Sequence, residues 1–350
     1  MKIVTIVGAR PQFVKAAAVS HSLRTKAEEI LVHTGQHYDL QMSDLFFQEL
    51  EIPTPNYHLG IGSGSHGAQT GKMLAEIEQV LERESPDLLL VYGDTNSTLA
   101  GALAAAKLQL PIAHVEAGLR SFNRRMPEEI NRVMTDHLST RLFAPTQTAV
   151  DNLQQEGIRT GVHLVGDVMY DIFLKLAKVA PTRSKILAEQ NLIPQGYYLL
   201  TLHRAENTDD PMRLRAIMET LQQSGLPLVF PVHPRTKKQL AAMGIALASK
   251  QIKLLEPVGY FEMLNLELNA IAILTDSGGV QKEAYFAGVP CLTLREETEW
   301  VETVAAGWNR LVGADPKKLQ AALKLDWVSE SRPDLYGDGK AAELITEILQ

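Results

Sequence analysis

The sequence predicts an α/β protein with two Rossmann-like domains, each a doubly wound sheet of parallel strands. Three observations support this fold class. Short apolar runs alternate with helical stretches along the whole chain. Most of these runs are continuously apolar, as expected of parallel strands that helices cover on both faces. The length of 350 residues is long for one hydrophobic core and comfortable for two.

The expected strands form two series in chain order. The first series covers 2–7, 30–34, 88–93, 112–116, 141–144 and 162–166, and the second covers 197–203, 228–232, 252–256, 271–275 and 290–294. The stretches between them fit crossover helices, such as the segment that opens at Pro127, where a first helical turn favours proline. We place the first domain at 1–168 and the second at 169–335. A terminal helix within 336–350 is expected to pack back on the first domain.

Composition excludes several classes of protein. The net charge of -7 argues against a nucleic-acid partner, which requires a basic face. No apolar run approaches the roughly 18 residues of a membrane span, and a strand begins at once where a signal peptide would stand. The single cysteine, Cys291, lies in an apolar run and is expected to pack in a core, which suits a reducing compartment. We therefore expect a cytoplasmic protein without a membrane partner.

Residues 272–288 read as a buried strand, a glycine turn and a helix. This geometry points backbone N–H groups and the positive end of the helix dipole at an anion, usually a phosphate. Ser277, Gly278 and Gly279 form the turn, and Glu283 lies further along the helix, where a carboxylate could accept hydrogen bonds from a ribose. The pattern suggests a nucleoside diphosphate. The alternative is an ordinary capped helix whose glycines only allow close packing.

The first strand also ends in a turn with cationic side chains. Gly8-Ala9-Arg10-Pro11 is followed by Lys15 one turn later, so Arg10 and Lys15 could contact a charged sugar nucleotide beside a helix N-terminus. A solvated basic pair is the alternative. The turn is not the G-x-G-x-x-G of a dinucleotide site, and no Cys/His cluster has metal-ligand spacing. We expect no cofactor and no metal.

Carboxylates follow successive strands of the first series. Asp94 and Glu116 each come directly after a strand, and Glu128 and Glu129 open a helix in which Arg132 lies one turn later. Carboxylates that face one cleft can take and give protons. Asp94 has an alternative role as the cap of the helix that follows it.

Two histidines end strands of the second series. His203 follows YYLLTL and His233 follows LVFPV. Either could contact a diphosphate or the reacting sugar oxygen, although a histidine at such a position is often structural.

Together these motifs resemble the non-hydrolysing UDP-N-acetylglucosamine 2-epimerase family. The resemblance runs in order over nearly the whole chain, through the Gly8 turn, TGQHYD at 34–39, YGDTNSTLAGALAA at 92–105, HVEAGLR at 114–120, MPEEINR at 126–132, LHRAEN at 202–207 and DSGGVQKEA at 276–284. It implies the GT-B architecture, with the active site between two Rossmann-like domains, and a homodimer.

The resemblance also implies roles for individual residues. Asp94, Glu116 and Glu128 match the catalytic acids of the family. Its diphosphate and sugar ligands are matched by Arg10, Lys15, Arg132 and His203, and its UDP site by Ser277, Gly278, Gly279 and Glu283. The implied reaction is epimerisation of UDP-GlcNAc to UDP-ManNAc through elimination of UDP, for cell-surface polysaccharide precursors.

Several positions depart from the pattern of many bacterial members. Ala9 and Gln12 replace residues of their Gly-Thr-Arg-Pro-Glu turn, and Gln36-His37-Tyr38-Asp39 stands where they carry a Gln-His-Arg segment. That segment serves activation by substrate in those members. The resemblance therefore does not imply such activation for this chain. Other blocks are closer to a branch that includes UDP-2,3-diacetamido-2,3-dideoxyglucuronate 2-epimerases, so this uronate is the alternative substrate.

Two arginines bear on the choice of sugar. Arg124 and Arg125 precede the helix that carries Glu128 and could pair with a C6 carboxylate, or they could belong to a solvated loop. Alternatives of another class are a GT-B glycosyltransferase, which needs an acceptor, and a UDP-sugar-binding regulator, which leaves the sugar unchanged.

Overall fold

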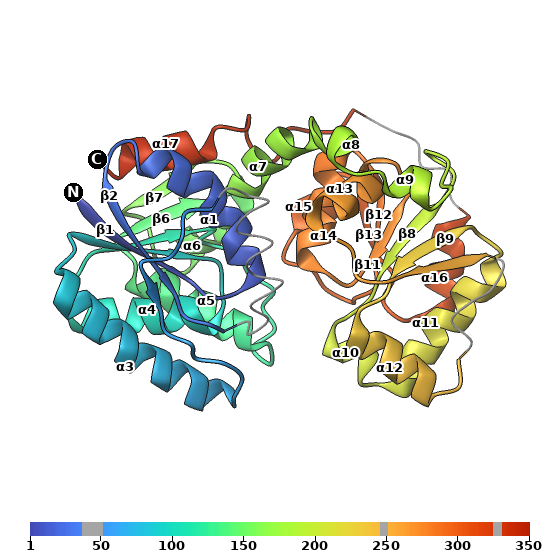
Figure 1. Ribbon diagram of the computed structural model, residues 1–350, viewed down its shortest axis with the longest axis horizontal. Helices are drawn as coiled ribbons and strands as arrows, with labels where there is room; N and C mark the ends of the chain where they lie inside the picture. The colour runs from blue at the N-terminus through green and yellow to red at the C-terminus, as the bar shows by residue number, and fades with distance from the viewer. Residues whose placement is uncertain (37–51, 246–250, 325–330) are drawn as a thin grey trace. The chain divides into compact units, whose positions relative to one another are not determined.

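The chain folds into two compact units. The computed structural model describes residues 1–36, 52–245, 251–324 and 331–350, and for Arg10 it describes the backbone only. The first unit joins Met1–Leu174 to Asp334–Gln350, and the second unit is Lys175–Pro333. Part of the TGQHYD block therefore lies outside the described residues. Figure 1 labels most of the helices and strands of each unit.

The first unit has a seven-stranded sheet with the order β3-β2-β1-β4-β5-β6-β7, and all of its pairings are parallel. Its strands are β1 (Lys2–Val7), β2 (Glu28–His33), β3 (Tyr57–His58), β4 (Leu88–Tyr92), β5 (Ile112–Val115), β6 (Arg141–Ala144) and β7 (Val162–Leu164). Its helices are α1 (Arg10–Leu23), α3 (His66–Glu84), α4 (Asn96–Lys107), α5 (Pro127–Leu138), α6 (Gln147–Gln155), most of α7 (Val168–Ala177) and the terminal α17 (Ala341–Ile348).

The second unit has a six-stranded parallel sheet with the order β10-β9-β8-β11-β12-β13. Its strands are β8 (Tyr198–Thr201), β9 (Leu228–Pro231), β10 (Ile252–Leu255), β11 (Ile273–Thr275), β12 (Cys291–Thr293) and β13 (Asn309–Leu311). Its helices are α8 (Ala180–Arg183), α9 (Ile186–Glu189), α10 (Ala205–Thr208), α11 (Pro211–Ser224), α12 (Pro234–Ala242), α13 (Tyr260–Leu268), α14 (Gly278–Ala287), α15 (Val301–Ala305) and α16 (Pro316–Leu323). No described helix is both long and apolar enough to cross a membrane.

Both faces of the second sheet are buried. Leu200 and Leu274 belong to one apolar cluster, whereas their chain neighbours Leu199 and Ile273 belong to another. Because successive side chains of a strand point to opposite faces, the two clusters lie on opposite sides of the sheet. This explains why the strands read as continuous apolar runs. Cys291 packs in the second cluster as predicted, and burial raises the pKa of its thiol to about 12.

Proline marks the start of several helices. Both α11 and α16 begin at a proline that follows an aspartate, and the Asp210 and Asp315 carboxylates accept the next free backbone N–H groups. Proline suits this position because its missing N–H would have no partner there. The helix expected to open at Pro127 also begins at its proline, as α5.

The predicted fold class is confirmed, since each expected strand forms and the two series build two parallel sheets. The sequence prediction missed the edge strands β3 and β13. Tyr57–His58 has only two residues, and Asn309–Leu311 mixes polar and apolar side chains. Neither offers the apolar run by which buried strands are recognised.

The division between the units falls inside α7, after Leu174, whereas the expected boundary lay after residue 168. The first turns of α7 are tied to the terminal segment. The Asp167 N–H donates to the Tyr336 carbonyl at 3.0 Å, and the Asp171 carboxylate accepts from the Ala342 N–H at 2.8 Å. The helix α17 also packs against α1 within the first unit.

Candidate active site

The predicted acids of the first unit follow neighbouring strands. In the sheet β1, β4 and β5 are adjacent and parallel, so the turns after them share one edge. Asp94 and Glu116 stand in two of these turns, and Lys15 lies on α1, which follows the third. The side chain of Arg10 lies outside the described part of the structure.

Lys15 and Glu116 form a buried ion pair between Nζ and Oε2. Sequence reasoning assigned Lys15 to the diphosphate and did not foresee this contact. The backbone of Glu116 has a φ of 71°, an uncommon conformation for a residue with a side chain. Such conformations concentrate at functional sites, where the surrounding structure holds them in place.

Gly93 lies against this ion pair. Its φ of 61° is left-handed, and a Cβ added there would lie 3.0 Å from Lys15 Nζ and 3.2 Å from Glu116 Oε2. A larger residue would push the pair apart, so the position requires glycine. Sequence reasoning gave Gly93 no role, although a glycine between a buried strand and an acid was the signal.

Asp94 pairs with Arg132. The distance from Arg132 Nη2 to Asp94 Oδ2 is 2.5 Å, and the arginine is buried while the acid is partly exposed. The alternative that Asp94 caps the next helix is wrong, because Thr95 is the N-cap of α4 and its Oγ1 accepts the Thr98 N–H.

The two acids that open α5 differ sharply. Glu129 is buried, accepts the Ser121 and Phe122 N–H groups at 2.9 Å each, and pairs with Arg132 at 3.0 Å. It holds the preceding loop to the helix. Glu128 is half-buried and makes no hydrogen bond or ion pair within the described residues. Of the two, Glu128 has the carboxylate that a ligand can reach.

In the second unit Asp276 anchors the turn after β8. It is fully buried and accepts the His203 N–H at 3.1 Å and the Arg204 N–H at 2.9 Å. Burial alone would raise the pKa of this carboxyl, but hydrogen bonds and the charge interaction with His203 hold the pKa below its ordinary value. His203 Nδ1 lies 3.3 Å from Asp276 Oδ1, and its half-exposed ring keeps Nε2 for a ligand.

His233 is the N-cap of α12. Its Nδ1 accepts the Arg235 N–H at 3.2 Å, so this nitrogen serves the helix. The centroids of the His203 and His233 rings are 6.3 Å apart. The structure thus brings the two predicted histidines together, with a helix-capping role for the second.

Ser277 caps α14, and its Oγ accepts the Val280 N–H at 3.4 Å. Packing does not require that the next two residues, Gly278 and Gly279, lack a side chain. A Cβ on Gly278 would come no closer than 3.6 Å to any neighbour, and one on Gly279 no closer than 3.8 Å. Neither has a positive φ. Their missing side chains therefore keep the helix N-terminus open, which suits an approaching anion.

Arg204 adds a cation beside that N-terminus. Its Nη2 lies 3.9 Å from the Cβ position of Gly278. Within the described residues its guanidinium makes no hydrogen bond or ion pair. Sequence reasoning gave Arg204 no role, because the approach of the turn after β8 to α14 depends on the sheet order.

Glu283 lies further along α14 and accepts the Tyr260 O–H at 3.0 Å. Glu267 of α13 is buried nearby. Burial, and after it the charge of Glu283, raises the pKa of Glu267 well above its ordinary value.

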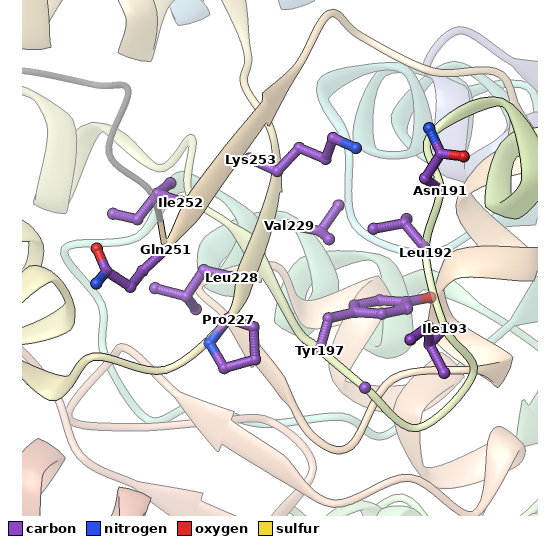
Figure 2. Close-up of a pocket in the computed structure, with 11 residues that line it drawn as sticks. Asn191, Leu192, Ile193, Tyr197, Pro227, Leu228, Val229, Gln251, Ile252 and Lys253 are labelled. Atoms are coloured by element: carbon purple, nitrogen blue, oxygen red, sulfur yellow. The ribbon is translucent and has the colours of Figure 1, made fainter.

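A cavity of about 410 Å³ lies elsewhere in the second unit (Figure 2). Tyr197, Pro227 and Gln251 line it directly before β8, β9 and β10. Ligands of open α/β sheets bind at the carboxyl ends of strands, and this cavity is at the amino ends. It contains none of the predicted site residues.

Comparisons with known proteins agree on one family. The family model described as UDP-N-acetylglucosamine 2-epimerase matches residues 21–350. A protein of Methanococcus maripaludis named UDP-N-acetylglucosamine 2-epimerase homolog is 58% identical, over 100% of this chain and 99% of its own length. The UDP-2,3-diacetamido-2,3-dideoxy-D-glucuronate 2-epimerase of Pseudomonas aeruginosa is 52% identical with the same coverage.

The fold matches a solved structure of the same kind. The crystal structure of Methanocaldococcus jannaschii UDP-GlcNAc 2-epimerase in complex with UDP-GlcNAc and UDP is similar with a TM-score of 0.93. The two sequences are 48% identical over 100% of this chain and 99% of that chain.

Proposed function

The chain belongs to the UDP-N-acetylglucosamine 2-epimerase family, and we propose that it interconverts UDP-GlcNAc and UDP-ManNAc without net hydrolysis. The observation that carries the proposal is the set of three acids, Asp94, Glu116 and Glu128, on neighbouring elements of one unit. The open helix N-terminus of the other unit supports it as the place of the diphosphate.

Inversion at C2 of such a sugar requires an indirect route, because the C2 proton is not next to a carbonyl group. The C1–O bond breaks first, and its electron pair leaves on the β-phosphate of UDP. The positive charge that develops at C1 acidifies the C2 proton, which a carboxylate removes as a C1–C2 double bond forms. The intermediate is a 2-acetamidoglucal. Proton addition at C2 from the opposite face and return of UDP to C1 give the epimer.

The departing diphosphate sets the first requirement of this route. Backbone N–H groups at the start of α14, with His203 and Arg204 beside them, can stabilise the charge that builds up there. Glu283 is assigned to the ribose hydroxyls. Arg10, Lys15 and His233 remain proposed ligands of the substrate, with Lys15 also fixing the Glu116 carboxylate.

Proton transfer at both faces of C2 sets the second requirement. Glu128 has no cation holding it within the described residues, and we assign it a proton-transfer role. Asp94 and Glu116 are held in place by Arg132 and Lys15. These pairs orient the two carboxylates toward fixed positions and keep the acids from shifting during the reaction.

Incubation of the purified protein with UDP-GlcNAc alone tests the proposal. An epimerase needs no acceptor and forms UDP-ManNAc until equilibrium, which chromatography or proton NMR detects. A glycosyltransferase would need an acceptor, and a binding module would return the sugar unchanged. Absence of UDP-ManNAc would therefore refute the assignment for this substrate.

The uronate UDP-2,3-diacetamido-2,3-dideoxyglucuronate is the second candidate substrate. Arg124 and Arg125 are exposed, and their guanidinium groups have no partner within the described residues, so a C6 carboxylate could pair with them. The 52% identity with the Pseudomonas aeruginosa enzyme also favours it.

The ratio of kcat/KM for the two sugars decides between them. If the uronate is the substrate, Arg124→Ala with Arg125→Ala should lower its kcat/KM by roughly tenfold or more and leave UDP-GlcNAc unaffected. Arg159→Ala, at an exposed position elsewhere in the unit, is the matched control. Efficient turnover of UDP-GlcNAc with no turnover of the uronate would remove the pairing.

We further propose that the enzyme works in the cytoplasm as a homodimer and supplies precursors of cell-surface polysaccharides. The buried single thiol suits a reducing compartment, and the family resemblance supports the rest. Light scattering during size-exclusion chromatography tests the dimer, which should give twice the mass of the chain.

A further inference from the structure

His114 lies in β5, fully buried, between two hydrogen-bond acceptors. Its Nε2 is 2.7 Å from the Gly93 carbonyl oxygen, and its Nδ1 is 2.7 Å from Asp136 Oδ1. A carbonyl oxygen can only accept, so Nε2 must carry a hydrogen.

Asp136 is held as a carboxylate. Its second oxygen, Oδ2, accepts from Arg120 Nη1 at 2.7 Å and from the Gly118 N–H at 3.1 Å. Burial opposes ionisation, but hydrogen bonds and charges from His114 and Arg120 hold the pKa of Asp136 below its ordinary value. Asp136 therefore contacts His114 through one oxygen and holds Arg120 and Gly118 through the other.

Arg120 extends this network. It makes two further bonds of 2.7 Å to Glu156. The half-exposed His137 touches the outer side of Glu156 at 3.5 Å. Because its members are bonded to one another, the network holds His114 in one orientation.

The network is connected to the proposed acids through the turn after β4, through β5 and through α5. Gly93 precedes Asp94 and lies against the Lys15–Glu116 pair, and its N–H donates to the Val115 carbonyl at 3.0 Å. Asp136 lies one turn after Arg132 on α5, and Arg132 holds Asp94. His114 therefore joins the turn after β4 to the helix that carries Glu128.

We propose that His114 is a positioning residue, which fixes Asp94, Glu116 and α5 relative to one another for the reaction. This inference rests on the proposed function for its effect on turnover. His114 itself touches no substrate. Its contribution is the geometry of groups that must lie within a fraction of an ångström of their working positions.

Two amide substitutions of His114 test its bonds to Asp136 and Gly93 one at a time. The nitrogen of His114→Asn can replace Nδ1 and reach Asp136, whereas that of His114→Gln can replace Nε2 and reach Gly93. We expect kcat to fall at least about tenfold further in the Asn variant, because loss of the Gly93 bond displaces the acids. KM and the calorimetric affinity for UDP should change less than about twofold in both variants.

Ser20→Ala is the matched structural control, since it removes a buried hydrogen bond to Glu29 elsewhere in the unit. Its kcat should stay at the level of the wild type. Equal kcat values in the Asn, Gln and Ser20→Ala variants would overturn the positioning role.

Nitrogen NMR of the wild-type ring tests the hydrogen bond to Gly93 without any substrate. Signals absent from the His114→Gln spectrum belong to His114, and Nε2 should carry a slowly exchanging proton. An Nε2 without a proton would overturn this hydrogen bond. A chain inactive on both sugars would instead defeat the proposed function, while this spectrum still decides the hydrogen bond.

Discussion

Each predicted catalytic acid of the first unit has a different environment. Arg132 holds Asp94, Lys15 holds Glu116, and Glu128 has no such partner within the described residues. Sequence alone placed all three near strand ends or a helix start. It could not pair them, because pairing depends on where α1 and α5 lie across the sheet. For the same reason the sequence could not show that Glu128 and Glu129 have different environments.

Substitution of the two neighbouring glutamates should give opposite results. Glu128→Gln removes proton transfer and should lower turnover roughly 10²-fold or more with little change in unfolding free energy. Glu129→Gln removes the charge that Arg132 and the loop N–H groups contact, and should lower the unfolding free energy by about 1–3 kcal/mol. Steady-state kinetics and denaturant unfolding measure the two effects.

This pair of variants also tests the assignment of Glu128. If Glu128→Gln kept the turnover of the wild type, the proton-transfer role would have to pass to Asp94 or Glu116.

At the scale of elements, the strand–turn–helix unit around α14 is the clearest signal in the sequence. Its glycines could serve close packing or an open helix end. The structure distinguishes these interpretations, because neither glycine has a positive φ and the neighbouring atoms leave room for a Cβ at both. The interpretation of an open anion-binding helix end is favoured. Sequence could not decide this, because the space around a Cβ depends on Trp300 and Arg204, which come from distant segments.

Gly279→Ala should therefore change stability and binding in opposite directions. Alanine fits the space and restricts the unfolded chain, so we expect the unfolding free energy to stay level or rise by about 0.4–1 kcal/mol. The added methyl group would crowd the diphosphate, and UDP affinity should fall at least about tenfold, as measured by calorimetry.

Gly71→Ala provides the control, because Gly71 is an exposed glycine of α3 with open space around its Cβ position. It should gain stability without any change in UDP affinity. Unchanged UDP affinity in Gly279→Ala would exclude this helix end from the nucleotide site.

At the scale of the whole molecule, the fold follows from the sequence more completely than the substrate does. Period and composition predicted both sheets, because burial on two faces demands apolar strands. The exact sugar depends on a few groups around one carboxylate or hydroxyl. Within the described part of the chain, the exposed loop with Arg124 and Arg125 is the feature that bears on this choice. No pattern of strands and helices encodes that choice.

The join between α7 and the terminal helix should make stability depend on pH. Burial raises the pKa of Asp171 to about 6 from an ordinary value of 3.8, despite its bond to the Ala342 N–H. Because the folded pKa is the higher one, its stabilising contribution is complete below pH 3.8 and is lost as the pH rises through 6. After solvent screening the loss should be roughly 1–2 kcal/mol.

Asp171→Asn keeps an acceptor for Ala342 and cannot ionise. The variant should therefore gain stability relative to the wild type as the pH rises from 5 to 7.5, measured by denaturant unfolding at both values. A difference that does not vary with pH would contradict the shifted titration of Asp171.

Isotope labelling tests whether C2 inverts by elimination of UDP and its return. The reaction is run in heavy water with UDP-GlcNAc that carries labelled oxygen in the bridge between C1 and the β-phosphate. Elimination and re-addition should give UDP-ManNAc with deuterium at C2 and with the bridge label scrambled among the β-phosphate oxygens. Product that retains its original C2 hydrogen would contradict this route and indicate oxidation with internal return of a hydride.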